Sequence, residues 1–347
     1  MLKGYLSRAF TLRGGEAMRS RITMWVALAL WPMNAALPQT TAEMLGYPAD
    51  AKLLIVNADD FGMCHAENVA TMELLLGGYI TSATAMPPCP WFKEAAQLAR
   101  EHPEIAIGIH TTLTSEWTMY KWGPVLGAAV PSLQAPDGYL PESSLWVETH
   151  AKPEEVEREI RAQIERAINL GINPTHLDNH MGSVYGLMTG RHFLDVTFKL
   201  CAEYGLPFRL PRNLNENLRQ ALPEDRLREI ERIVAAAVRQ GFALPDFLQT
   251  VQHRKSYEET WEQYASIFRN LRPGVTELYI HVAVDMPEIR AISGAWERRV
   301  WDYQVFKDPR TRALLDSLGV QMISYRPLQE LQRQHLPPRG KESHQRR

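Results

Sequence analysis

Acidic and imidazole side chains occur at three places in this 347-residue sequence, each at or after a short apolar run. The first place holds two adjacent carboxylates, Asp59 and Asp60, which follow the apolar residues 53–56. Adjacent carboxylates repel each other unless a cation, a shared proton or bulk water intervenes. One carboxylate that binds a divalent metal beside one that handles a proton would resolve the repulsion. An N-cap residue next to a solvated acid, at a strand–helix junction, is the alternative.

The second and third places supply further residues of the kind that bind metals. His110 ends one apolar run, and His176, Asp178 and His180 follow at alternate positions of a later segment. Alternate residues of an extended strand point to the same side. Two neutral imidazoles with one carboxylate suit zinc and accept other divalent transition ions. A single histidine is more often structural than a ligand, but the three strand ends together favour a metal site.

A parallel sheet would bring these residues together, because the C-terminal ends of parallel strands form one active face. Strand patterns alternate with helix patterns along most of the chain, which predicts an α/β protein with a mainly parallel sheet. Seven or eight such units favour an incomplete (β/α) barrel over an open sheet. The expected strands are 53–60, 80–86, 105–110, 175–180, 207–210, 246–248, 278–284 and 320–324. The expected helices are 66–76, 91–101, 153–170, 191–204, 224–240, 257–270 and 309–318.

The alternation stops over residues 111–152, a long aromatic loop after the third strand that is rich in Gly and Pro. Long connections in compact domains are usually functional or disordered, and aromatic content argues against disorder. We expect a lid or a substrate platform, because aromatic faces stack on the apolar faces of sugar rings. Local packing of the loop is the alternative. Its aromatic residues include Trp117, Tyr120, Trp122, Tyr139 and Trp146.

Composition excludes several classes of protein. A net charge of -2 argues against a general nucleic-acid binder, which would usually be basic. Cys64, Cys89 and Cys201 are too few and too scattered for a disulfide framework or a thiolate zinc site. A nucleophilic pair of Cys64 with His65 is rejected, because adjacent residues at a helix start point apart and nothing orients them.

The N-terminal residues 1–36 are expected to be a signal peptide and extension. Residues 18–21 supply a basic start, residues 24–31 an apolar run, and Ala35 and Ala36 small residues for cleavage. The run is shorter than the roughly 20 residues of a membrane span. We therefore expect an exported protein, periplasmic or secreted, without a stable membrane span after signal removal; a buried N-terminal helix is the alternative. The remaining divisions are a linker over 37–51, a single barrel domain over 52–330 and a flexible tail over 331–347.

Four motifs in one order carry a resemblance to a known family. They are NADDFG at 57–62, GIHTTLT at 108–114, THLDNH at 175–180 and PGVTELYIH at 273–281. Over residues 52–328 the chain resembles the YdjC-like carbohydrate deacetylases, which include chitooligosaccharide deacetylases. Many members carry a further histidine two positions after the one that matches His180, where this chain has Gly182. That difference bears on the substrate at the rim more than on the metal.

The resemblance implies an irregular (β/α) barrel of about seven parallel strands that removes acetyl groups from N-acetylated amino sugars. It implies a divalent metal cofactor, zinc, magnesium or a similar ion, held by Asp60, His110 and His180. Asp59 matches the proposed catalytic base. The implied partner is an oligosaccharide substrate, and the sequence leaves homo-oligomer formation open.

Further roles follow from the residues at the other strand ends. A metal ion would polarise the amide carbonyl, Asp59 would accept a proton from the attacking water, and an acid would protonate the leaving amine. His281 is the candidate acid, and a histidine that orients a neighbour is the alternative. His176 and Asp178 are expected to hold the ligands and their tautomers, although Asp178 could itself be a ligand.

Four residues are candidates for contact with sugar. Two of them, Trp296 and Arg299, follow the last site strand, and a surface ion pair of Arg299 with Asp302 is the alternative. The other two, Trp117 and Trp122, belong to the aromatic loop.

Two competing functions remain open. The first is a barrel metallohydrolase that acts on another amide or ester; a phosphoester is disfavoured because the sequence has no Gly-rich phosphate loop. The second is a carbohydrate-binding protein without turnover. Retention of both Asp59 and Asp60 argues against the second, because binding alone needs no base.

Overall fold

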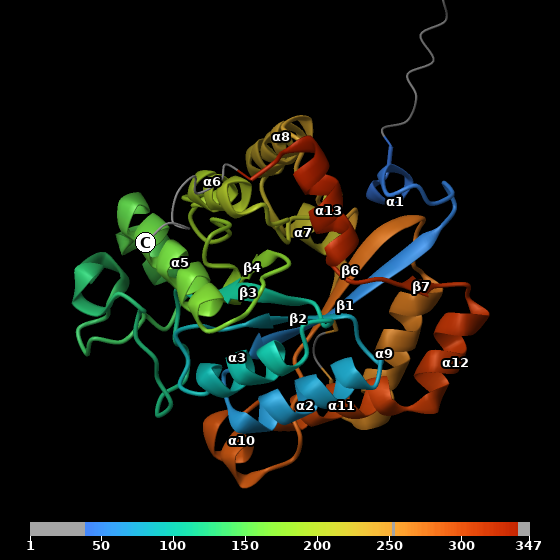
Figure 1. Cartoon of the computed structure of the whole chain (residues 1–347), viewed down its shortest axis with the longest axis horizontal. Coiled ribbons are helices and arrows are strands. Elements are labelled where there is room, and N and C mark those ends of the chain that lie inside the picture. The colour runs from blue at the N-terminus through green and yellow to red at the C-terminus, as the bar shows by residue number, and fades with distance from the viewer. Residues whose placement is uncertain (1–38, 252–253, 339–347) are drawn as a thin grey trace, which may run out of the picture. The chain divides into compact units, whose positions relative to one another are not determined.

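The computed structural model describes residues 39–251 and 254–338, whose centre is a curled sheet of parallel strands (Figure 1). The strand order is β4-β3-β2-β1-β6-β5, and β7 pairs with the start of β1. The sheet forms a half-barrel, which confirms the predicted α/β barrel class. The strands are β1 (Lys52–Phe61), β2 (Ser82–Ala85), β3 (Ile107–Thr111), β4 (Leu177–Asn179), β5 (Phe247–Gln249), β6 (Gly274–Ile280) and β7 (Gln321–Met322).

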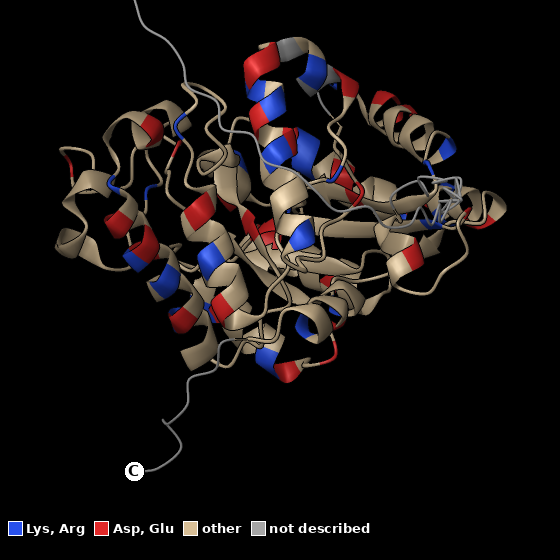
Figure 2. Ribbon diagram, turned by 90° about the horizontal axis from the view of Figure 1, so that it is seen from above, with Lys and Arg blue, Asp and Glu red and all other residues tan. Residues whose placement is uncertain are grey.

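Helices cover the outer side of the sheet (Figure 1). Those that the sequence predicted lie within a few residues of the expected bounds, and they are α2 (His65–Leu76), α3 (Phe92–Glu101), α5 (Pro153–Asn169), α6 (Leu194–Tyr204), α8 (Glu224–Arg239), α9 (Tyr257–Arg269) and α12 (Pro309–Ser317). The additional helices are α1 (Thr41–Met44), α4 (Ser144–His150), α7 (Glu216–Ala221), α10 (Pro287–Ile292), α11 (Trp296–Lys307) and α13 (Arg326–His335). Figure 2 shows that charged residues of both signs are interleaved along these helices.

Strand β1 is the central strand of the sheet. Its apolar start, residues 53–56, is at most 1% exposed, and its ladder with β6 runs from Lys52 to Ala58. Helix α2 packs against the strand from outside. A strand paired on both sides and covered by a helix has a fixed register. Its C-terminal residues are therefore held firmly at the active face.

The predicted strand over 207–210 is wrong as a strand, although the segment lies where a strand would close the barrel. It makes one isolated bridge, between Phe208 and Leu177 of β4. Pro207 and Pro211 bracket it, and neither can donate to a ladder. The same segment continues to the start of β5, where the N–H of Arg212 donates to the carbonyl of Pro245 at 2.9 Å. Residues 207–213 thus link the two edge strands.

Three other predicted bounds need correction. The strand expected over 278–284 is β6, which begins four residues earlier and ends at Ile280, because the backbone of His281 turns to donate to Asp302. The long segment 111–152 contains α4 and the short 3₁₀ turns η1 (Gly127–Ala129) and η2 (Pro131–Leu133). The strand expected over 175–180 is β4, Leu177–Asn179, because the 3₁₀ turn η3 (His180–Gly182) follows it.

The two ends of the described chain also differ from the predicted linker and tail. Within the predicted linker, α1 has a capping box between Thr40 and Glu43, and the N–H of Thr41 donates to Asp246 at 2.9 Å. At the other end, Leu331 and Gln332 are buried within α13, so the tail cannot begin at residue 331. The predicted signal segment, 1–36, lies outside the described residues. Among the described helices, none has the length and apolar character that crossing a bilayer requires.

Candidate metal centre

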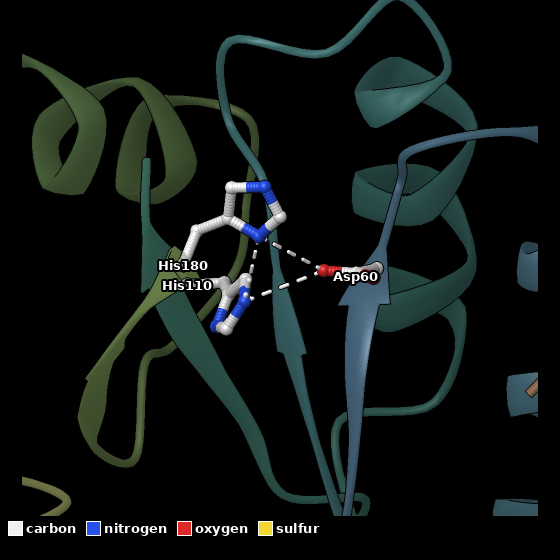
Figure 3. Close-up of side chains that lie close together, drawn as sticks. All are labelled: Asp60, His110 and His180. Atoms are coloured by element: carbon white, nitrogen blue, oxygen red, sulfur yellow. Dashed lines mark hydrogen bonds and ion pairs between the residues drawn. The ribbon is translucent and has the colours of Figure 1, made fainter. Parts of the chain in front are cut away.

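Three buried side chains from three strand ends converge at the active face (Figure 3). The Oδ1 atom of Asp60 lies 3.3 Å from Nε2 of His110 and 3.3 Å from Nδ1 of His180. Those two nitrogens are also 3.3 Å apart. The residues come from β1, β3 and the turn after β4, as the argument from parallel strand ends predicted.

A bulge at the end of β1 lets two adjacent carboxylates face the same histidine. The register between β1 and β2 shifts between Ala58 and Phe61, and Asp60 has a left-handed φ of 66°. A regular strand would point successive side chains to opposite faces, and a bulge re-aims one of them. Oδ2 of Asp59 consequently lies 4.0 Å from Nε2 of His110, on the same side as Asp60.

The alternative of a cap and a solvated acid is wrong for these carboxylates. Asp59 is 3% exposed and Asp60 is 1% exposed. The N-cap residue of α2 is Cys64, which lies outside the pair. Both acids are therefore buried charges that need compensation from their surroundings.

Asp178 holds His110 from the side away from the convergence point. Its Oδ1 lies 2.6 Å from Nδ1 of His110, while Nε2 of that ring faces Asp60. A carboxylate on one imidazole nitrogen fixes the tautomer and leaves the other nitrogen free to bind a metal. Thr84 donates to the remaining oxygen of Asp178 at 2.8 Å. The geometry favours the holding role for Asp178 over the role of ligand.

His176 is linked to Asp59 through Asn57. Its Nε2 is 3.2 Å from the side-chain oxygen of Asn57, whose amide donates to Asp59 at 2.9 Å. The ring stacks on Tyr325 with centroids 3.7 Å apart. A Cβ at Gly108 would lie 2.6 Å from this ring, so only glycine fits there. His176 thus supports Asp59 through Asn57 and contacts none of the three converging residues directly.

Arg209 is a buried cation that the sequence analysis missed. It donates two hydrogen bonds to Asp59, at 2.6 and 2.7 Å, and one to Glu277 at 2.8 Å. It also lies 2.8 Å from Asp178. The available signal was weak: an arginine between the apolar residues Phe208 and Leu210.

Charge interactions override burial in setting the protonation of the central groups. Burial acts to raise the pKa of Asp59, but Arg209 and then His110 lower it to about 2. Burial likewise acts to raise the pKa of Asp60, and Arg299 and the two histidines hold it well below its usual value. Both carboxylates are therefore ionised at neutral pH.

The histidines shift the other way. Burial acts to lower the pKa of His110, but Asp178 and Asp59 raise it well above its usual value. At His180, burial is outweighed by Glu116 and Asp60, and the pKa is raised to about 9. Both imidazoles are therefore protonated at neutral pH when no metal ion is bound.

His281, the candidate acid, lies beside the convergence point, and its side chain is 36% exposed. Its Nε2 is 3.9 Å from Oδ2 of Asp60. Burial lowers the pKa of His281 to about 4 despite the attraction of Asp60, so the ring is neutral at neutral pH. The ring could accept a hydrogen bond or a proton from a bound molecule.

Arg299 forms an ion pair with Asp60, and the alternative of a surface ion pair between Arg299 and Asp302 is wrong. One guanidinium nitrogen lies 2.9 Å from Oδ2 of Asp60, and another donates to the buried Glu67. Asp302 pairs instead with Arg254 at 2.6 Å. Arg299 is 8% exposed, so its guanidinium holds a carboxylate of the site and is largely unavailable to a sugar.

The three candidate tryptophans differ in access. Trp122 is 2% exposed and donates to the carbonyl of Thr114 at 2.8 Å, so it is a core residue and cannot stack on a sugar. Trp117 is partly buried, 5.5 Å from Trp122 and 5.7 Å from the Arg299 guanidinium. Trp296 is also partly buried, and the guanidinium of Arg290 lies 4.7 Å from its ring. Trp117 and Trp296 remain candidates for substrate contact.

The donor set fits a divalent metal ion. Neither carboxylate oxygen of Asp60 makes a regular hydrogen bond within the described residues, although both are buried. One carboxylate and two imidazole nitrogens, all within 4.8 Å of one another, suit zinc and related ions. A second set, Asp59 with His110 and Asp178, satisfies the same spacing. Arg209 already engages both of its carboxylates, so the first set is the better candidate.

A family model described as YdjC-like protein matches residues 53–317. Three relatives have names that describe an activity. A carbohydrate deacetylase of Geobacillus stearothermophilus is 31% identical over 281 residues, which cover 80% of this chain and 98% of the relative. A carbohydrate deacetylase of Thermus thermophilus is 34% identical over 76% of this chain and 89% of its own length. A chitooligosaccharide deacetylase of Yersinia pestis is 32% identical over 58% of this chain and 76% of its own length.

A solved structure is similar in fold and sequence. It is a protein of Enterococcus faecalis V583, proposed to cleave cellobiose phosphate, with a TM-score of 0.65 and 29% identity. The match covers 80% of this chain and 99% of that protein. The residues that the family model matches, 53–317, include all the strand ends that carry the converging residues.

Proposed function

Because this chain belongs to the YdjC-like protein family, we propose that it is a metal-dependent hydrolase that removes N-acetyl groups from amino-sugar oligosaccharides. The observation that carries the proposal is the convergence of Asp60, His110 and His180 beside the ionised carboxylate of Asp59. The relatives named carbohydrate and chitooligosaccharide deacetylase support the choice of bond and substrate.

Asp60, His110 and His180 would hold the ion, which when bound would polarise the amide carbonyl and lower the pKa of water. The remaining steps belong to the chain's own residues. Asp59, ionised and fixed by two hydrogen bonds from Arg209, accepts the proton of the attacking water. His281 lies on the more open side of Asp60, and its neutral ring would receive the proton that Asp59 takes from water and pass it to the leaving amine. Trp117 and Trp296 offer partly exposed rings for the sugar.

Acetate release from N-acetylated chitooligosaccharides tests the proposal. The full chain is assayed with added Zn, Mg, Mn or Co, beside Asp59→Asn and the surface variant Asp316→Asn. A general base contributes about 10²–10⁴-fold, so Asp59→Asn should lose turnover by that factor and keep its metal affinity. Asp316 is exposed and pairs with Arg312, so its variant should match the wild type.

Three results would change the proposal. Equal acetate release from wild type and Asp59→Asn would remove Asp59 as the base. Release of another acid from an amide or ester, with no acetate, would favour the broader metallohydrolase. Sugar binding that no metal converts into acetate release, and that Asp59→Asn leaves unchanged, would favour a carbohydrate-binding protein.

Export is proposed on the sequence of residues 18–36 alone. Expression of the full chain in a bacterial host, with fractionation and N-terminal sequencing of the mature protein, tests it. A mature N-terminus near residue 37 in the exported fraction is the expected result. Retention of the whole chain in the cytoplasm would contradict it.

A further inference from the structure

We propose that Glu116 is a positioning residue for His180, and that it couples metal binding to the docking of the aromatic segment, residues 114–122. The inference rests on the proposed metal site. Glu116 belongs to none of the motifs that the sequence analysis singled out. It lies within the long segment after β3, close to Trp117 and Trp122 in the sequence.

The geometry places Glu116 on the far side of the His180 ring. Its Oε2 lies 2.9 Å from Nε2 of His180, whereas Nδ1 of that ring lies 3.3 Å from Asp60. A carboxylate that accepts the proton of Nε2–H leaves the Nδ1 lone pair free for a metal. Glu116 therefore fixes the tautomer and orientation of His180 without being a ligand itself.

The same arrangement holds at the other imidazole, with the nitrogens exchanged. Asp178 contacts Nδ1 of His110 at 2.6 Å, and Nε2 faces Asp60. Each of the two rings thus has one nitrogen directed to the convergence point and one nitrogen bound to a carboxylate. Glu116 thus makes with His180 the contact that Asp178 makes with His110, which supports a positioning role for Glu116. The two differ in origin, since Asp178 is buried in the sheet and Glu116 belongs to a loop.

Glu116 is one of several contacts that dock the aromatic segment against the site. The ring of Trp122 packs edge-on to His180, with centroids 6.1 Å apart. Trp117 lies 5.7 Å from the guanidinium of Arg299, which in turn holds Asp60. The hydroxyl of Tyr120 donates to the carbonyl of Met63 at 2.6 Å. The segment therefore reaches both His180 and, through Arg299, Asp60.

Coupling between the metal and the segment is reciprocal. If the contact of Glu116 with His180 raises metal affinity by some factor, bound metal must stabilise that contact by the same factor. Loss of an outer partner of a metal ligand typically lowers metal affinity about 10–100-fold. We therefore expect bound metal to protect the backbone of residues 114–122 from hydrogen exchange, and this protection to depend on Glu116.

The test measures metal binding and hydrogen exchange in the full chain. The protein is stripped with a chelator, and its affinity for Zn²⁺ and Co²⁺ is measured by competition with a chromophoric chelator. Glu116→Ala should bind about 10–100-fold more weakly than the wild type. Glu116→Gln should fall in between, because its amide oxygen still accepts from Nε2–H. Glu142→Gln is the matched control, since Glu142 is exposed and pairs with Lys121 in the same long segment.

Each outcome separates a positioning role from a structural one. Metal-induced protection of residues 114–122 should be present in the wild type and in Glu142→Gln, and reduced in Glu116→Ala. An unchanged metal affinity in Glu116→Ala and Glu116→Gln would overturn the inference, even if both variants melt at a lower temperature without metal. If the wild type itself binds no metal, the proposed metal site fails together with the inference. If the wild type binds and the Glu116 variants bind equally well, only the inference fails.

Discussion

Replacement of Arg209 by methionine should destabilise the protein far more than the loss of a single exposed ion pair. The arginine is 4% exposed, and its three partners, Asp59, Asp178 and Glu277, are equally inaccessible to water. Although burial acts to raise the pKa of Asp59, Arg209 and then His110 lower it from 3.8 to about 2. That shift corresponds to about 2 kcal/mol of stabilisation at neutral pH, net of the burial cost. Without Arg209 the strongest of the charges that oppose the burial cost is lost and three buried carboxylates lose a partner, so we expect a loss of about 3–5 kcal/mol.

Urea unfolding at pH 7, with a chelator present to exclude metal effects, measures this loss. The control is Arg219→Met, whose exposed arginine pairs with the exposed Glu231 at 3.1 Å. The control should lose about 1 kcal/mol or less. Methionine has a similar length and packs adaptably, so lost charge dominates over lost volume. A loss for Arg209→Met no larger than that of the control would refute the reasoning that Arg209 compensates these carboxylates.

Three further predictions concern other residues of the barrel. Asp178→Asn should weaken metal binding about 10–100-fold in chelator competition, because the carboxylate that orients His110 becomes neutral; unchanged affinity would argue against that role. Trp122→Ala should lower the free energy of unfolding by about 3–5 kcal/mol, as for a core aromatic residue, and a large rise in KM without loss of stability would contradict its burial. Burial raises the pKa of Glu277 to about 7 from 4.5 despite Arg209. The folded state then keeps a proton that the unfolded state releases, so this group's contribution to stability is full below pH 4.5 and falls by about 3 kcal/mol as the pH rises through 7. Unfolding curves from pH 4.5 to 8 should show that fall in the wild type and a flatter profile in Glu277→Gln.

Sequence patterns located the strand ends because parallel strands impose a simple rule on them. An apolar run followed by a polar metal-type residue marks the edge where such strands end, and the rule brought together Asp60, His110 and His180. The rule does not depend on the exact bounds of the strands. The position of His281, just beyond β6, was therefore useful although the predicted strand began four residues too late.

The bulge at Asp60 could not be predicted in the same way. Strand periodicity assigns Asp59 and Asp60 to opposite faces, and only the left-handed backbone at Asp60 places both beside His110. An aspartate tolerates that conformation better than most residues, but the sequence alone does not reveal where it is adopted.

Buried charge explains most of the other misses. Helix α11 was not predicted, because its buried face includes Arg299 and Asp302 and so lacks an apolar stripe. Arg209 and Glu116 are single charged residues in segments rich in proline or aromatic residues, where a solvated position is the usual expectation. Each becomes informative only when its partners are known. Arg209 and Asp59 are 150 residues apart in the sequence, and Glu116 and His180 are 64 residues apart.

The charge balance at the site connects these residues to metal binding. Two guanidinium groups face six carboxylates there. Burial raises the pKa of Glu67 well above its usual value and that of Glu277 to about 7, so the other four carboxylates carry most of the negative charge and leave an excess of about two charges. The guanidinium groups are those of Arg209 and Arg299, and the four carboxylates are those of Asp59, Asp60, Asp178 and Glu116. An excess of this size in a buried site requires positive charge from elsewhere.

His110 and His180 supply that charge in the absence of an ion. Although burial acts against it, neighbouring carboxylates raise the pKa of both imidazoles, that of His180 to about 9, so each carries a proton at neutral pH. Metal ligands must be deprotonated, so a divalent ion that binds here displaces these two protons and brings the same two positive charges. The local charge is then unchanged by binding. The outer carboxylates and guanidinium groups therefore face the same local charge with and without the ion, so the buried site can be assembled before the metal arrives.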